Sequence, residues 1–226
     1  SVQFDICSKL KNIVLMDDYN DWTIFLALAK RKGLDISILS SIYVIKQESS
    51  CGGANEELGK KKFEWVESLL SSESDRCTDN IFLICDRDEA LIDFHQNGVS
   101  VVGQKSKDAI KKAKGNEKAL GLHFLAWKRR EIKTYLLSFT ALFKSGVIEK
   151  VNNGKLPADY HLREYDPGDN ESIRALDVKS YITELIDTVG VGLDEAKLNA
   201  YVNEIPKSEI SEDIENMYNY LVGNLS

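Results

Sequence analysis

Two short clusters of carboxylates are the residues of this chain best suited to chemistry. Their members are Asp17, Asp18, Asp21, Asp86, Asp88 and Glu89. Carboxylates packed closely repel one another unless a cation lies between them. Mg²⁺ binds such oxygens together with water and phosphate oxygens, and two divalent ions about 3.5–4 Å apart can hydrolyse a phosphodiester. The clusters therefore predict a site for two Mg²⁺ or Mn²⁺ ions.

The same acids also have a structural interpretation. An aspartate after a strand often forms a turn, and Asp21 stands where a helix would begin, so it fits the role of N-cap. In extended backbone, residues two apart point to the same side. Asp86 and Asp88 can therefore bind one ion together. A turn or a helix cap would not require two acids on the same side of the chain.

The segments beside the acids are expected to form a parallel sheet. Four or five apolar residues without alternation indicate a strand buried on both faces. The expected strands are residues 13–16, 41–45, 81–85 and 120–127, and the expected helices are 21–32, 60–70 and a segment after 131 that ends near 143. In open α/β sheets, ligands bind at the carboxyl ends of the strands, where both acid clusters would lie.

The sequence divides into an α/β domain, residues 1–145, and a helical C-terminal region, residues 146–226, with helices near 176–189, 193–203 and 208–222. The expected fold is a four-stranded parallel sheet flanked by helices. Residues 1–145 hold 22 Lys and Arg against 20 Asp and Glu, a net +2, whereas residues 146–226 hold 7 against 16, a net −9.

A basic stretch follows the acid clusters. Residues 105–145 hold 11 basic and 3 acidic residues, and cations of this density suit a polyanion such as DNA. The candidates for nucleic-acid binding are Lys128, Arg129 and Arg130. For the lysines between 105 and 114, a solvated helix face is an equally good interpretation.

Several classes of protein are disfavoured. No run approaches the roughly 18 apolar residues of a membrane helix. The four cysteines form no C-x-x-C pair and the three histidines are scattered, so a zinc site is not expected. The cysteine pattern also favours a protein of the reducing cytoplasm. The chain has no Gly-x-x-x-x-Gly-Lys loop for binding ATP.

Five segments carry a resemblance to a known family. They are Leu-Met-Asp-Asp-Tyr-Asn-Asp at 15–21, Cys-Asp-Arg-Asp at 85–88, Arg-Arg-Glu-Ile-Lys-Thr-Tyr-Leu-Leu at 129–137, Ala-Leu-Asp-Val-Lys-Ser-Tyr-Ile at 175–182 and Ile-Pro-Lys-Ser-Glu-Ile at 205–210. In this order they resemble the TOPRIM domain of OLD-family nucleases, the nuclease half of ATPase–nuclease proteins in prokaryotic antiviral defence. The likeness covers roughly residues 12–143 and extends toward the C-terminus.

The resemblance implies a metal-dependent DNA endonuclease or nickase. Its metal ligands would be Asp17, Asp21, Asp86, Asp88 and Glu89. Asp17 and Glu131 would also act in catalysis, and Lys179 would contact the scissile phosphate. An ABC-type ATPase would be present in a further part of the polypeptide or in a partner, and would make the protein a homo-oligomer. The absence of an initial Met suggests a piece of a longer protein.

Three departures from the family pattern leave other functions open. Asp17 replaces a glutamate, Asp18 a glycine, and Lys133-Thr134 a Glu-Asn pair, so an active and a decayed site both fit, although we favour activity. A decayed TOPRIM-like module would bind nucleic acid or brace an assembly. The third alternative is a receiver domain, because Asp17-Asp18 after a strand is typical of one, but the next acidic strand end is too distant for that fold.

Overall fold

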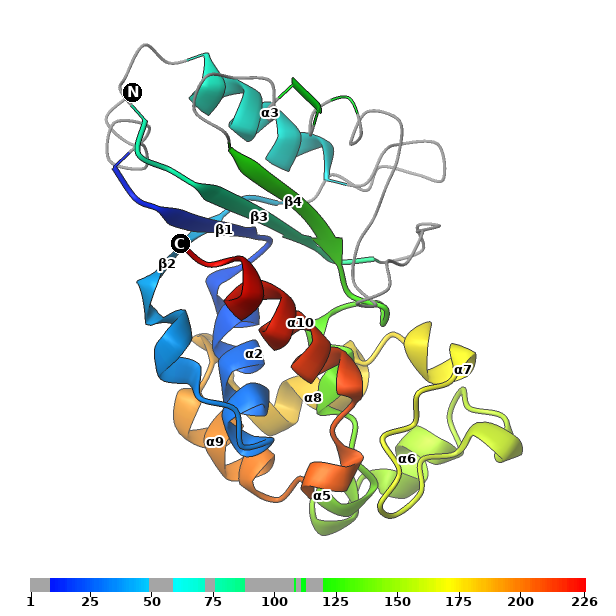
Figure 1. Ribbon diagram of the computed structural model, residues 1–226. Helices are drawn as coiled ribbons and strands as arrows, with labels where there is room; N and C mark the ends of the chain where they lie inside the picture. The colour runs from blue at the N-terminus through cyan, green and yellow to red at the C-terminus, as the bar shows by residue number, and fades with distance from the viewer. Residues whose placement is uncertain (1–8, 49–58, 72–75, 88–107, 109–110, 113–119) are drawn as a thin grey trace. The chain divides into compact units, whose positions relative to one another are not determined.

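A computed structural model of the chain describes residues 9–48, 59–71, 76–87, 108, 111–112 and 120–226 (Figure 1). Its centre is a four-stranded sheet in the order β2-β1-β3-β4, with every pair parallel. The strands are β1 (Asn12–Met16), β2 (Ile42–Lys46), β3 (Asn80–Cys85) and β4 (Gly121–Ala126). The predicted α/β class, the parallel sheet and its four strands are thus confirmed, with strand ends that differ by at most one residue.

The chain divides into two compact units, and both are discontinuous in sequence. The first unit comprises the described parts of residues 1–19, 37–127 and 219–226, and it holds the whole sheet. The second unit comprises residues 20–36 and 128–218. The boundary expected between residues 145 and 146 falls inside the second unit.

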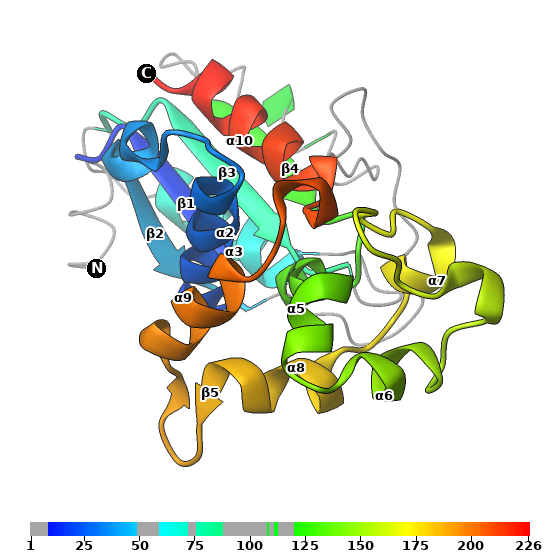
Figure 2. The ribbon, with the colours of Figure 1, turned by 90° about the horizontal axis from the view of Figure 1, so that it is seen from below.

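The sheet of the first unit is covered on both faces. Helix α3 (Lys60–Leu70) packs Phe63, Val66 and Leu69 against one face of the strands. On the other face His123 stacks on Phe82, with ring centroids 4.5 Å apart. The C-terminal end of α10, drawn red in Figure 2, adds Tyr220, whose ring meets those of both residues edge-on. Burial on both faces explains why β1 and β3 lack alternation in sequence.

The second unit is mainly helical. Its helices are α2 (Tyr19–Arg31, from residue 20), α5 (Phe139–Lys144), α6 (Ile148–Asn152), α7 (Glu171–Arg174), α8 (Lys179–Ile186), α9 (Glu195–Asn203) and α10 (Glu212–Asn224, up to residue 218). Short 3₁₀ turns lie at Ile132–Leu136, Ala158–Tyr160 and Lys207–Glu209, and another at Ile36–Ser41 joins the units in sequence. A small antiparallel hairpin, β5 (Asp187–Thr188) with β6 (Gly192–Leu193), separates α8 from α9.

Two helix predictions need correction. The helix expected to continue to residue 143 is interrupted: the 3₁₀ turn ends at Leu136, and Leu137 and Ser138 are extended before α5 begins. The Ser138 side chain caps α5 by accepting a hydrogen bond from Ala141 N. The helix expected over 176–189 is shorter, because α8 ends at Ile186 and the chain continues as β5.

Within the described residues, no helix is both long enough and apolar enough to cross a membrane.

Candidate functional site

The strand order places a topological switch point in the first unit. From β1 the chain passes to β2 on one side, and it later enters β3 on the other side of β1. The carboxyl ends of β1 and β3 therefore flank the position where open α/β sheets bind ligands. Asp17 and Asp18 directly follow β1, and Asp86 directly follows β3. The structure thus has these acids at the strand ends that the sequence indicated.

The register of the sheet distinguishes the two aspartates that follow β1. Asn12 pairs with Asn80 and Leu15 with Leu83. Continued by the same step, this register aligns Asp17 with Cys85 and Asp18 with Asp86. Cys85 belongs to the core beneath α3, so Asp17 occupies a register position on the face of the sheet that α3 covers.

A lysine from α3 binds Asp17. The Nζ of Lys62 forms a hydrogen-bonded ion pair with Oδ1 of Asp17. The Lys62 side chain is 0% exposed, whereas that of Asp17 is 21% exposed. A buried ammonium is stable only when paired, so Asp17 is the counter-ion that lets Lys62 occupy this interior position.

A glycine lets the start of α3 lie close to the sheet. Gly59 precedes the helix with φ of +78°, and a Cβ there would lie 2.6 Å from Cε2 of Phe124 and 3.0 Å from Sγ of Cys85. Only glycine permits both this backbone conformation and this close approach. The helix therefore begins directly against the carboxyl-terminal half of the sheet, one turn before Lys62.

The described residues do not form the predicted two-ion site. Within them, no three His, Cys, Asp or Glu side chains gather in a way that could hold a metal ion. Asp88 and Glu89 lie outside the described residues. Aspartate oxygens suit Mg²⁺ or Mn²⁺, but Asp17 already has an ammonium on one of its oxygens.

Three further predicted residues belong to the second unit. Asp21 is buried in the first turn of α2, and Glu131 is partly buried directly before the 3₁₀ turn at Ile132–Leu136. Lys179 is exposed at the start of α8, and its backbone N–H donates to Oδ1 of Asp177. Their catalytic and metal-binding roles stay predictions.

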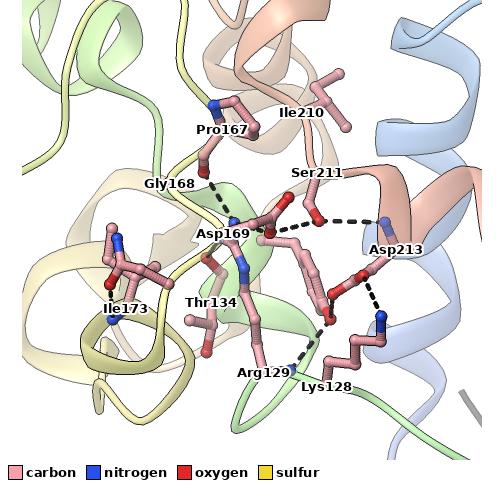
Figure 3. A network of polar contacts seen from close by, with 12 residues as sticks. Lys128, Arg129, Thr134, Pro167, Gly168, Asp169, Ile173, Ile210, Ser211 and Asp213 are labelled. Atoms are coloured by element: carbon pink, nitrogen blue, oxygen red, sulfur yellow. Dashed lines mark hydrogen bonds and ion pairs between the residues drawn. The ribbon is translucent and has the colours of Figure 1, made fainter. Parts of the chain in front are cut away.

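Arg129 is the centre of a polar network in the second unit (Figure 3). Its side chain is 1% exposed. Nη1 donates to the Thr134 carbonyl at 2.9 Å, and Nη2 donates to the Pro167 carbonyl at 2.8 Å and to Oδ1 of Asp169 at 3.0 Å. The guanidinium also lies over the Tyr135 ring, with Cζ 4.7 Å from the centroid.

The network continues to Asp213 through Tyr135 and Ser211. The Tyr135 hydroxyl donates to Oδ2 of Asp213 at 2.6 Å and accepts from the backbone N–H of Arg129 at 3.2 Å. The Ser211 hydroxyl donates to Oδ1 of Asp169 at 2.8 Å and accepts from the Asp213 N–H at 3.1 Å. Burial, followed by the charge of Asp213, raises the pKa of Tyr135 well above its ordinary value. Tyr135 is therefore a neutral donor and not a base.

These contacts revise the predicted nucleic-acid interface. Since the Arg129 guanidinium is buried and bonded within its own unit, we assign it a structural role instead of the predicted contact with DNA. Lys128 is partly buried, and its Nζ lies 3.8 Å from Oδ1 of Asp213. The Arg130 backbone donates to the Arg174 carbonyl. Nucleic-acid binding by Lys128 and Arg130 stays a prediction.

Sequence reasoning missed two charged residues that the structure makes prominent. Glu209 is 1% exposed and accepts from the Ser138 hydroxyl at 2.7 Å, from both the N–H and the hydroxyl of Thr140, and from the Tyr165 N–H. Glu209 lies in the Ile-Pro-Lys-Ser-Glu-Ile segment, so the hydrogen bonds that it accepts give that segment a structural role. Lys62 had a signal in the sequence, because it shares the inward face of a helix with Val66 and Leu69.

Comparisons of the chain with models of protein families, with curated proteins and with solved structures find no match. Membership of the OLD family is therefore a prediction from the sequence. The sheet, its switch point and the contacts of the charged residues are the structural basis for a functional proposal.

Proposed function

We propose that this chain is a metal-dependent DNA endonuclease or nickase whose reaction centre lies at the carboxyl ends of β1 and β3. The observation that carries the proposal is that acids follow both strands at the topological switch point of a parallel sheet. This is where such sheets bind ligands, and carboxylates there suit a divalent ion that contacts phosphate.

Within the described residues, Asp86 is the carboxylate that best fits the reaction centre. When bound, a divalent ion would supply Lewis acidity and an activated water. Asp17 and Lys62 fix the end of β1 beside it through their ion pair. The parts assigned to Asp21, Glu131 and Lys179, the ATPase partner and a role in antiviral defence rest on the resemblance of the sequence.

A second function has one specific observation in its favour. A TOPRIM-like module without catalysis would need no free acid cluster, and the Lys62–Asp17 pair neutralises one of the predicted ligands. Such a module would bind nucleic acid or brace an assembly. A receiver domain is less well supported, because the lysine at the acids comes from α3 and the described sheet has no fifth strand.

Cleavage of supercoiled plasmid tests the proposal. With Mg²⁺ or Mn²⁺ we expect open-circular or linear products that EDTA prevents, and we expect Asp86→Asn to abolish them. Asp79→Asn is the matched control, because it makes the same change of charge at the amino end of the same strand. Binding of DNA without cleavage in either metal would favour the second function, and transfer of phosphate from acetyl phosphate to an aspartate would favour the receiver.

A further inference from the structure

We infer that Lys62 is the resident cation of Asp17, so that Asp17 is not a metal ligand and the centre uses one divalent ion instead of two. The statement about the ion rests on the proposed function. The statement about Lys62 rests on the contact between its Nζ and Asp17 Oδ1 and on its complete burial.

The first argument is the position of the ammonium. Lys62 lies in the first turn of α3, and α3 is packed on the sheet by Phe63 and Val66. Gly59 lets the start of the helix lie close to Phe124 and Cys85, because a Cβ at this position would clash with both side chains. The ammonium cannot move to solvent without displacing this helix, so it stays at Asp17 when an ion approaches.

The second argument is charge. A divalent ion on the Asp17 carboxylate would lie close to the Lys62 ammonium, and two cations at such a distance repel strongly in a partly buried site. Asp17 has one negative charge, which the ammonium already balances. Mg²⁺ in phosphate-processing sites needs only one or two carboxylates, with water and phosphate completing its shell, so a single ion does not require Asp17.

The third argument is the register of the sheet. Continued beyond its last pair, Leu15 with Leu83, the register aligns Asp17 with Cys85, which lies in the core beneath α3, and Asp18 with Asp86. Side chains alternate between the faces of a strand. Asp17 therefore occupies a register position on the face of the sheet that α3 covers, whereas Asp18 and Asp86 occupy the alternate position.

Titration with Mn²⁺, followed by the EPR signal of the free ion, measures the number and affinity of bound ions. The full chain is compared with Asp17→Asn, Lys62→Met and the matched control Lys61→Met, whose lysine is exposed and pairs with Glu48. We expect one Mn²⁺ per wild-type chain, and the same number with an affinity within twofold for Asp17→Asn and Lys61→Met. Lys62→Met should gain an additional Mn²⁺, or bind at least tenfold more tightly.

The double variant Asp17→Asn/Lys62→Met should lose that gain, and the pair of Lys62 variants decides the question even where Asp17→Asn alone does not fold. Two ions in the wild type, a tenfold loss in folded Asp17→Asn, or no gain in Lys62→Met would overturn the inference. If the wild type binds no Mn²⁺ but Lys62→Met gains an Asp17-dependent ion, the statement about Lys62 and Asp17 holds, whereas the statement about the single ion and the proposed nuclease both fail. Plasmid cleavage is measured separately. If it fails, the number of bound ions still tests the inference about Lys62 and Asp17.

Discussion

The Lys62–Asp17 pair predicts an unequal response of stability to removal of either partner. Asp17→Asn leaves a fully buried ammonium beside a neutral amide, because the Lys62 side chain is 0% exposed. Removing one partner of a buried pair costs about 3–5 kcal/mol. We expect about 3 kcal/mol, the lower end, since Asp17 itself is 21% exposed and solvent screens part of the interaction.

The reverse change should cost less. Lys62→Met keeps most of the side-chain volume and leaves a carboxylate that water can reach, so we expect a loss of about 1 kcal/mol. The double variant should lie close to Lys62→Met, because neither variant contains the buried ammonium that Asp17→Asn deprives of its carboxylate. The coupling free energy between the two sites is then about 3 kcal/mol.

Thermal unfolding measures these differences. For a chain of 226 residues, 1 kcal/mol corresponds to a shift in Tm of about 2–4 °C, so Asp17→Asn should lower Tm by about 6–12 °C. Lys61→Met removes an exposed pair with Glu48 and should change stability by less than about 1 kcal/mol. A higher Tm in Asp17→Asn would refute the reasoning, because relief of repulsion is expected only where Asp17 belongs to an uncompensated acid cluster.

Three further perturbations follow from the described contacts. Glu209→Gln should destabilise the protein by about 2 kcal/mol or more, since a buried carboxylate that accepts four hydrogen bonds is replaced by a weaker acceptor; urea unfolding should show this, and Glu204→Gln, at an exposed ion pair, should have little effect. Burial raises the pKa of the Asp169 carboxyl, but its polar and charged partners, above all Arg129, lower it more. The net result is a pKa below the ordinary value of 3.8. Its folded pKa is thus depressed, so the stability it adds is present above about pH 4 and is lost as the pH falls further; the urea midpoints of wild type and Asp169→Asn should converge in that range, and a constant gap would contradict this. Gly59→Ala should lower Tm by several degrees, because it combines positive φ with a Cβ 2.6 Å from a ring carbon.

The sheet was predictable because burial on both faces leaves a plain signal in sequence. β1 and β3 are apolar runs that end at acids, and α3 has its inward residues at helical spacing. The interruption at Leu137 and Ser138 was not predictable from local pattern. Ser138 is held by Glu209, which lies far along the chain, and contacts of that kind leave no periodic trace.

The charged residues were harder to interpret than the apolar ones. A single sequence reports that a side chain is charged but not which charge lies beside it. Arg129 stands in a basic stretch that suits DNA, yet its guanidinium binds Asp169 in the same unit. Asp17 stands in an acid cluster that suits metal, yet its carboxylate binds Lys62. In both cases the partner is remote in sequence.

This pairing changes how loss of activity in variants should be interpreted. Replacing Asp17 or Arg129 leaves a buried opposite charge or a broken network, so loss of cleavage in either variant follows from damage to the fold as readily as from damage to chemistry. A claim of a direct role for them requires an unchanged Tm. Asp86 follows β3, and Asp79 precedes the same strand. Comparing cleavage by Asp86→Asn and Asp79→Asn therefore distinguishes the effect of losing a charge at the carboxyl end of the strand from the effect of losing any charge. Evidence for a nuclease therefore depends on that comparison more than on the residues that the sequence made most conspicuous.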